Sequence, residues 1–330
     1  MITDLFCSLK KNIKRLFRHL RFLDDWVKNF QWYFYIGWCK ARNSITGDII
    51  FARCWVDGWG SSISVRNWGD DINKFFFEYI TGAKVIFLPK DKILFKLMQR
   101  YIMIGSILGH YELRNAIVYG TGFMSAQRKA HGIPKKIISV RGPLTRNALL
   151  QQNIDCPEHY GDPVLLLPLF YKSSAKKYGG VSIIPNIRTF RGAYPVVDEL
   201  VNKYNCQIIN MTSYGKWTDI IDEITGSSFI ISESLHGLIV AEAYNIPCVW
   251  VEFIDHLALQ VNEDWNFKFL DFYESIGKHN MKSIKLYEDF NFDELMKKKD
   301  EWKPGTIDYE QLLNDFPFKI DAAKKFPLKP

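Results

Sequence analysis

Hydrophobic residues in the first half of the chain come in short runs, and segments with helical spacing separate several of these runs. A run of four or five apolar residues bounded by turn residues is typical of a buried strand, whereas apolar residues three or four apart predict a helix. The runs that predict strands lie at residues 49–52, 84–88, 101–104, 116–119 and 136–140, and the predicted helices at 71–80 and 143–150. Pro143 fits the first turn of its helix, because the N–H that proline lacks has no helical partner there.

The second half of the chain repeats this alternation. Strands are predicted near 181–184, 206–210, 228–232 and 247–251, and helices near 195–203, 217–224 and 236–244. Short apolar strands that alternate with helices indicate parallel sheets covered on both faces. The pattern therefore predicts an α/β protein with two Rossmann-like domains facing each other across a cleft. Ligands of such sheets bind beyond the carboxyl ends of the strands.

A stretch rich in Ser, Lys and Gly at residues 171–180 marks the expected boundary between these domains. Four parts are expected: an arm at 1–47, an N-terminal Rossmann-like domain at 48–172, a C-terminal one at 173–260, and a final segment at 261–330. The last segment has weak periodicity, and we expect helices there that pack back on the domains.

Composition excludes several classes of protein. The chain has 330 residues, of which 47% are hydrophobic and 24% charged, so a mainly disordered protein is excluded. The first 42 residues hold nine lysines and arginines against three aspartates, and so carry six of the seven net positive charges. The body is nearly neutral, which argues against nucleic-acid binding. Six cysteines without a C-x-x-C pair predict reduced, mostly buried thiols in a cytoplasmic protein.

The basic arm has the spacing of an amphipathic helix. Its apolar stripe consists of Leu9, Ile13, Leu16, Phe17, Leu20, Leu23 and Val27, and its basic face of Lys11, Lys14, Arg15, Arg18 and Arg21. A basic amphipathic helix followed by Trp and Tyr predicts a segment lying on an anionic membrane surface. The alternative is a helix packed on the protein with solvated charges. No secretory signal and no stretch of about 18–20 apolar residues is present, so we expect peripheral attachment.

The segment at residues 228–247 is the strongest candidate for chemistry. A buried strand ends at Ser232, a polar turn follows, and His236 lies at the start of a helix. The N-terminus of a helix attracts anions, and a histidine there adds charge or transfers a proton. The alternative is a histidine that only caps or packs locally.

Arg141 is the second candidate, because it directly follows a strand and precedes the helix that Pro143 opens. This position places a guanidinium at a strand's carboxyl end, where it would hold a phosphate or carboxylate with two parallel hydrogen bonds. A salt bridge on the rim of the sheet is the alternative. Arg188 and Arg191, in a loop after another strand, are either anion ligands or solvated charges.

Weaker signals come from turns and caps. The turns at Gly105-Ser106 and 120–122 follow strands and allow a ligand close to the backbone. Asp70 is expected to cap the helix that follows it. The sequence contains no G-x-G-x-x-G, no phosphate-loop motif, no D-x-D pair and no His-x-x-x-His, so we predict neither a dinucleotide site nor a metal.

Four motifs resemble those of the polysaccharide pyruvyl transferases, over roughly residues 48–255. They are Asn67-Trp68-Gly69-Asp70, Val140-Arg141-Gly142-Pro143, Tyr160-Gly161-Asp162-Pro163, and Ser232-x-Ser234-Leu235-His236-Gly237 followed by Ala241 and Asn245-Ile246-Pro247. The resemblance implies a fold like that of the GT-B glycosyltransferases. It also implies transfer of the enolpyruvyl group of phosphoenolpyruvate to two hydroxyls of one sugar, which gives a cyclic pyruvate ketal and phosphate. Phosphoenolpyruvate is then a donor substrate, and no cofactor is expected.

The resemblance also implies roles for individual residues. The family's histidine falls on His236, expected as general acid, and its donor-binding arginine on Arg141. Many members carry Arg where this chain has Ser234, so Arg188 or Arg191 is expected to supply the missing charge. The other expected substrate-binding residues are Asn67, Gly69, Asp70, Gly105, Ser106, Gly120 and Gly122 on the acceptor side, domain 48–172, and Ser234, Leu235 and Gly237 on the donor side, domain 173–260.

The family's setting in surface polysaccharide synthesis suggests a lipid-linked acceptor at the inner face of the cytoplasmic membrane. The basic arm would then hold the protein at the membrane that carries this acceptor. Two other functions are weighed against pyruvyl transfer. One is a GT-B glycosyltransferase that uses a nucleotide sugar, and the other is a catalytically inactive scaffold at the membrane. The presence of both His236 and Arg141 argues against the scaffold.

Overall fold

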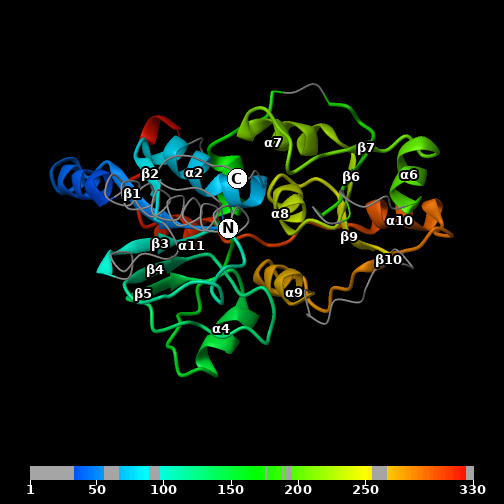
Figure 1. Ribbon diagram of the computed structural model, residues 1–330. Coiled ribbons are helices and arrows are strands. Elements are labelled where there is room, and N and C mark those ends of the chain that lie inside the picture. Colours follow the sequence, from blue (N-terminus) through cyan, green and yellow to red (C-terminus); the bar gives the residue numbers. More distant parts are fainter. Residues whose placement is uncertain are drawn as a thin grey trace, which may run out of the picture. The chain divides into compact units, whose positions relative to one another are not determined.

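The computed structural model describes residues 33–55, 67–88, 97–174, 177–186, 189, 195–254 and 266–324. Its first sheet has five strands in the order β2-β1-β3-β4-β5 (Figure 1). The strands are β1 (Ile49–Arg53), β2 (Lys84–Phe87), β3 (Arg100–Ile102), β4 (Ala116–Tyr119) and β5 (Lys136–Ser139). Each overlaps a predicted strand, and the pairs from β1 through β5 are parallel, as expected.

The second sheet has the order β10-β9-β8-β6-β7 and is also parallel. Its strands are β6 (Val181–Ile184), β7 (Gln207–Ile208), β8 (Phe229–Ser232), β9 (Cys248–Phe253) and β10 (Ile284–Leu286). The first four were predicted. The strand β10, in the segment expected to be helical, was not, because only one of its three residues is buried. The two parallel five-stranded sheets confirm the α/β fold with two Rossmann-like halves.

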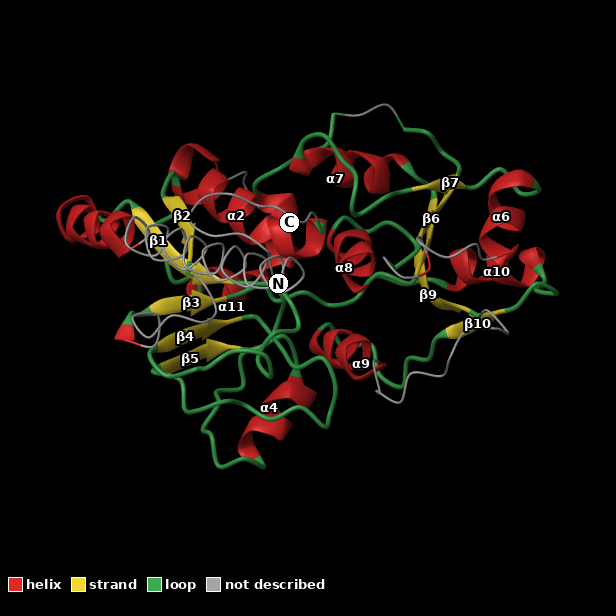
Figure 2. Ribbon diagram, viewed as in Figure 1, coloured by secondary structure: helices red, strands yellow, loops and turns green. Residues whose placement is uncertain are grey.

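Helices flank both sheets (Figure 2). They are α2 (Trp68–Thr81), α4 (Pro143–Leu150), η1 (Pro163–Leu169), α6 (Pro195–Asn202), α7 (Trp217–Gly226), α8 (Leu235–Ala243), α9 (Asn266–Ser275), α10 (Phe292–Glu301), α11 (Tyr309–Asn314) and η2 (Ala322–Lys324). A continuous apolar core runs from the first sheet through η1 and α8 to the second sheet. The helix α8 is buried on nearly every side, which is why its sequence is apolar all round.

The order of the strands places a switch point in each sheet. In the first sheet the chain goes from β1 outward to β2 and returns to the other side of β1 as β3. In the second sheet it goes from β6 to β7 and returns beside β6 as β8. Ligands of open α/β sheets bind at the carboxyl ends of such neighbouring strands. We therefore expect a site where the segments after β1, β3, β6 and β8 meet.

The helix α2 joins the two halves. The indole of Trp68 is fully buried; its Nε1 donates to the carbonyl of Trp217 at 2.7 Å, and its backbone N–H donates to the carbonyl of Met211 at 2.8 Å. The phenolic hydroxyl of Tyr214 donates to the carboxylate of Asp71. Because all three contacts lie in the first turn, this end of α2 is held firmly against the second half.

The described residues from 33 to 49 belong to a compact unit separate from the rest of the chain. Most of the basic arm lies outside the described residues. The described part is a helix over residues 33–46, on which Phe34 and Trp38 are exposed. Among the described helices, none has the length and apolar character that crossing a membrane requires. The five described cysteines are free and buried, as predicted; Cys7 lies outside the described residues.

Candidate functional site

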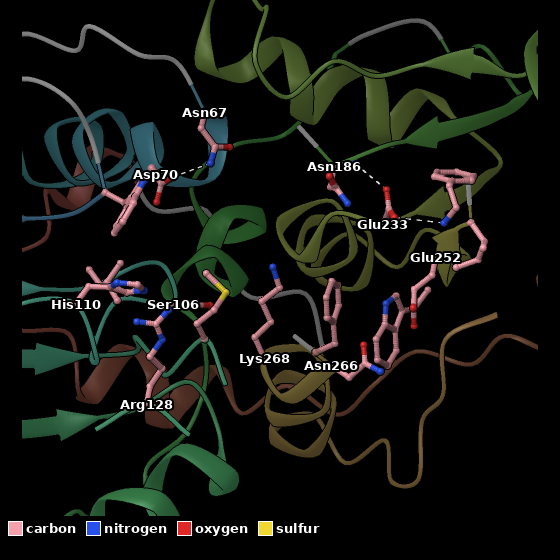
Figure 3. A pocket seen from close by; sticks show the side chains of 17 residues that line it. Asn67, Asp70, Ser106, His110, Arg128, Asn186, Glu233, Glu252, Asn266 and Lys268 are labelled. Carbon is pink, nitrogen blue, oxygen red and sulfur yellow. Dashed lines mark hydrogen bonds between the residues drawn. The ribbon is translucent and has the colours of Figure 1, made fainter. Parts of the chain in front are cut away.

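Two adjoining cavities lie at the switch points of the two sheets, where the fold leads us to expect a site. The larger has a volume of about 550 Å³ and the smaller about 170 Å³. Both are lined by Asn67, Asp70, Ser106, Met124, Asn186, Glu233 and Lys268 (Figure 3). Residues from both halves of the chain thus share one space, as the predicted cleft requires.

His236 lines the smaller cavity from the first turn of α8. Its ring is half-buried, and its Nε2 atom is buried without a hydrogen-bond partner among the described residues. Burial, together with the nearby charges of Lys268 and Arg141, lowers the pKa of the imidazole to about 3. The imidazole of the free protein is therefore neutral at neutral pH, with one polar atom available to a ligand.

Gly69, in the first turn of α2, leaves the space that the imidazole of His236 occupies. A Cβ atom at this position would lie 2.0 Å from Nδ1 of the imidazole, far inside van der Waals contact. The ring therefore lies against the backbone of α2, which the Trp68 contacts hold in place. Gly69 was expected to bind substrate; the structure places it behind the histidine instead.

Asp70 follows Gly69 and lines both cavities. The side-chain amide of Asn67 donates to Oδ2 of Asp70 at 2.6 Å (Figure 3). Burial raises the pKa of the Asp70 carboxyl to about 7, although Asn67 and Lys268 oppose the rise. The expectation that Asp70 caps the helix is wrong, because α2 begins two residues earlier and its N-cap is Asn67.

The loop after β3 forms the opposite wall. Gly105 has a φ of 118°, which favours glycine, and both Gly105 and Ser106 line the smaller cavity. Asn73 of α2 holds this loop, since its amide both donates to and accepts from the backbone of Ile104, at 3.0 Å each. Thr121 supports the loop from behind with a hydrogen bond from Oγ1 to the carbonyl of Gly105.

Gly120 and Gly122, expected at the substrate, line neither cavity. A Cβ at position 120 would meet the ring of Pro163 at 2.3 Å, and one at 122 would meet Nη2 of Arg141 at 2.6 Å. These glycines are needed for close packing behind the site. Their strand-turn position was the same as that of Gly105, so the sequence alone did not separate the two cases.

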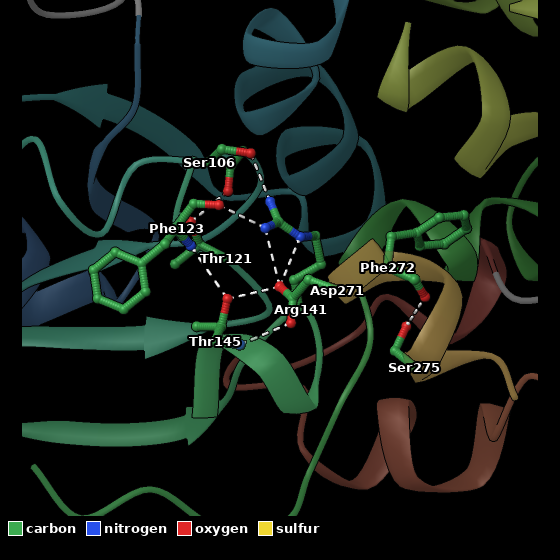
Figure 4. A network of polar contacts seen from close by, with 9 residues as sticks. Ser106, Thr121, Phe123, Arg141, Thr145, Asp271, Phe272 and Ser275 are labelled. Atoms are coloured by element: carbon green, nitrogen blue, oxygen red, sulfur yellow. Dashed lines mark hydrogen bonds and ion pairs between the residues drawn. The ribbon is translucent and has the colours of Figure 1, made fainter. Parts of the chain in front are cut away.

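The guanidinium of Arg141 is fully buried in a polar network rather than open to the cavities (Figure 4). Its Nε and Nη2 contact Oδ2 of Asp271, each at 3.0 Å. Nη2 also donates to the carbonyl of Phe123 at 2.7 Å, and Nη1 donates to the hydroxyl of Ser106 at 2.6 Å. Arg141 therefore reaches the site through Ser106, and the buried ion pair with Asp271 replaces the expected direct anion contact.

Asp271 connects this network to α9. Its carboxylate also accepts from the backbone N–H and the hydroxyl of Thr145, at 2.8 and 2.6 Å. A Cβ on Gly142 would lie 1.8 Å from the carbonyl oxygen of Asp271, so α9 packs directly against the start of α4. Lys268, one turn before Asp271, extends from this fixed helix into the space between Asp70 and Glu233 (Figure 3).

Lys268 is the functional candidate that sequence reasoning missed. It lies in a charged, weakly periodic segment far from the other motifs, and the only sequence signal was a cation in the first turn of a helix. Its charge lowers the pKa values of both His236 and Asp70, which places it near both. Arg188 and Arg191, expected to supply this charge, lie outside the described residues.

The remaining predicted residues surround His236. Ser234 is the N-cap of α8, and its hydroxyl accepts a hydrogen bond from the N–H of Gly237 at 3.4 Å. Ser234 and Leu235 line the smaller cavity. Gly237 does not line it and packs against Ile184 instead. Within the described ranges, no three His, Cys, Asp or Glu side chains are grouped to hold a metal ion.

The outer part of the larger cavity is aromatic. The rings of Trp250 and Phe269 stack with centroids 4.5 Å apart, and Trp55 packs edge-on against His110 at 4.8 Å. Arg128 also lines the larger cavity (Figure 3). Trp250 and Phe269 are buried against each other, whereas the ring of Trp55 is exposed, and an exposed flat apolar face beside polar groups suits a sugar ring.

Comparison with known proteins identifies relatives. Residues 5–256 match a family model described as polysaccharide pyruvyl transferase. The succinoglycan biosynthesis protein ExoV of Rhizobium meliloti (strain 1021) is 26% identical over 223 residues, which are 64% of this chain and 62% of that protein. The uncharacterized protein L143 of Acanthamoeba polyphaga mimivirus is 28% identical over 221 residues, 64% of this chain and 71% of that protein.

The match therefore spans less than two thirds of the length of ExoV. No solved structure matches the chain. Lys268 and Asp271 both lie beyond the residues that the family model covers.

Substitution Gly69→Ala is expected to displace the imidazole of His236 towards solvent, because the new methyl group would occupy its place. The pKa of His236 should then rise from about 3 towards its ordinary value of 6.5. NMR titration of the histidine ring measures this directly. Gly37→Ala is the control, since a Cβ there meets no atom within 4 Å. An unchanged His236 titration in the Gly69→Ala protein would contradict the contact.

Proposed function

Because the family model covers most of the chain, the chain belongs to the polysaccharide pyruvyl transferase family, and we propose that it forms a cyclic pyruvate ketal on a sugar. The donor is phosphoenolpyruvate, and two hydroxyls of one acceptor sugar replace its phosphate. The observation that carries the proposal is that one cavity is lined by Lys268 and by His236, whose buried Nε2 has no hydrogen-bond partner among the described residues. The similarity to ExoV supports a role in exopolysaccharide synthesis.

The smaller cavity is proposed as the donor site. Phosphoenolpyruvate carries a phosphate and a carboxylate, and its binding needs cations and N–H or O–H donors. Lys268 supplies the charge, Ser106 a hydroxyl, and the first turn of α8 its free backbone N–H groups. Lys268 thereby takes the place of the arginine that this chain lacks at Ser234.

His236 is proposed as the general acid for departure of the phosphate. Its imidazole is neutral in the free protein, but a trianionic donor beside Nε2 favours the protonated form and raises the pKa. The proton then passes to the leaving phosphate, and the second attacking hydroxyl returns a proton to the ring. Arg141 is proposed as a positioning residue: by holding Asp271 and Ser106 it fixes both α9 and the donor wall.

The acceptor is proposed to bind in the larger cavity, with a sugar ring on the exposed indole of Trp55 and its hydroxyls towards Asp70 and Asn67. The proposed acceptor contacts Asn67 and Asp70 come from the domain at 48–172, whereas the proposed donor site combines α8 of the domain at 173–260 with Ser106, which was expected on the acceptor side. The segment at 261–330 contributes Lys268 to the donor side, in addition to packing on the domains.

We expect Lys268→Met to weaken binding of phosphoenolpyruvate roughly 10- to 100-fold, because a hydrogen bond to a charged group contributes ~1.5–3 kcal/mol. Isothermal titration calorimetry measures the change. Lys282→Met, which removes an exposed lysine, is the control and should bind like the wild type. The wild type should also add pyruvate to a lipid-linked or aryl glycoside, as read by mass spectrometry.

Two results would contradict this function. One is equal affinity of the Lys268→Met and wild-type proteins for phosphoenolpyruvate. The other is thermal stabilisation of the wild type by nucleotides but not by phosphoenolpyruvate, which would favour the nucleotide-sugar glycosyltransferase.

We also propose that the N-terminal arm attaches the enzyme to an anionic membrane at its cytoplasmic face, where a lipid-linked acceptor would be available. In the described part of the arm, Phe34 and Trp38 are 72% and 53% exposed and lie one turn apart, with Lys40 exposed nearby. An aromatic face with basic neighbours suits the membrane interface. This proposal is independent of the reaction chemistry.

The double substitution Phe34→Ser/Trp38→Ser should lower binding to phosphatidylglycerol-containing vesicles at least about tenfold, since each buried aromatic contributes ~1.5–3 kcal/mol. Vesicle sedimentation measures the bound fraction. Ile133→Ser removes an equally exposed apolar side chain elsewhere and should have no effect. Undiminished binding of the double variant would argue against attachment through this helix.

A further inference from the structure

The reaction proposed above needs two proton-transfer groups, and the inference that follows rests on that proposed function. The methylene carbon of the donor gains one proton and becomes a methyl group. Two acceptor hydroxyls each lose a proton as their oxygens bond to the carbon that carried phosphate. One of these protons balances the methyl group, and the other leaves with phosphate. His236 serves the phosphate, so the carbon needs a second group.

Asp70 has the geometry for this task. It lines both the donor and the acceptor cavities, and it follows directly on Gly69, against which the imidazole of His236 lies. Asn67 holds Oδ2, whereas Oδ1 is 3.6 Å from the position of a Cβ on Gly105 in the opposite wall. The carboxyl is thus fixed between the two substrates and oriented by one hydrogen bond.

The surroundings of Asp70 favour a carboxyl that carries a proton. The titratable and charged groups around it are Asp71 on the same helix, Cys54 after β1, Tyr111, His236 on α8, Lys268 on α9, and Glu233 and Arg128 elsewhere in the cavities. Burial outweighs the attraction of Lys268, and the pKa of Asp70 rises to about 7. An acid with such a pKa is suited to give and take protons near neutral pH.

We propose that Asp70 is the catalytic residue that protonates the methylene carbon of the donor. Its carboxyl gives its proton to that carbon, and the resulting carboxylate takes the proton of the first attacking hydroxyl, which restores the acid. His236, which takes up a proton from solvent when the donor binds, then protonates the departing phosphate. It recovers a proton from the second hydroxyl and returns that proton to solvent when the products leave. Each group ends the cycle as it began, and no further reactant is needed.

Asp70→Asn tests this role while keeping the shape of the side chain. Turnover with phosphoenolpyruvate and a glycoside acceptor should fall about 10²- to 10⁴-fold, the usual contribution of a general acid, while donor affinity stays near that of the wild type. In the wild type kcat/KM should fall more steeply with pH above about 7, where Asp70 loses its proton, and this additional fall should vanish in the variant, whereas any fall due to His236 is common to both proteins. Asp198→Asn, exposed on α6, is the control.

The outcomes separate the two proposals. If the wild type forms no ketal with any acceptor, both the proposed function and the proposed role of Asp70 are wrong. If the wild type is active and the Asp70→Asn protein keeps the wild-type turnover, or the steeper fall of kcat/KM above about pH 7, only the proposed role of Asp70 is wrong. Asp70→Ser, a smaller polar replacement, gives the same test should the asparagine protein not fold.

Discussion

The site depends on a single close contact, that between the imidazole of His236 and the backbone of α2 at Gly69. No side chain fits at residue 69, since even a Cβ would lie 2.0 Å from Nδ1. Because Trp68 ties the same turn to the second half of the chain, the contact brings the switch points of two separate sheets to one space. The contact also buries Nε2 without a hydrogen-bond partner in the described part of the chain, which costs free energy unless another group supplies one.

A second constraint is the buried pair of Arg141 and Asp271. Removing either partner would leave an uncompensated charge in the core, so the pair fixes α9 against α4 and the loop at Ser106. That fixed helix carries Lys268 into the cavities. Two cations thus have different places: Arg141 is fully buried behind the site, and Lys268 lines the cavities.

Much of the fold follows from periodicity. Apolar runs such as 181–184 and the helix that Pro143 opens were located from pattern alone, as was the position of His236 at the start of α8. The parts that could not be predicted depend on contacts between distant residues. Arg141 was expected to be open to a ligand because it lies between a strand and a helix. Its actual partner, Asp271, is 130 residues away, and the local sequence gives no sign of it. Lys268 and β10 were missed because neither lies in a periodic apolar pattern.

If the imidazole of His236 faces the anionic donor, binding of phosphoenolpyruvate must change the titration of the ring, which NMR can follow with and without the donor. In the free protein the ring should stay neutral down to a pH near its pKa of about 3. Saturation with phosphoenolpyruvate should raise that pKa by several units, so that the ring carries a proton at mildly acidic pH. A ring that remains neutral over the same pH range with the donor bound would contradict the account.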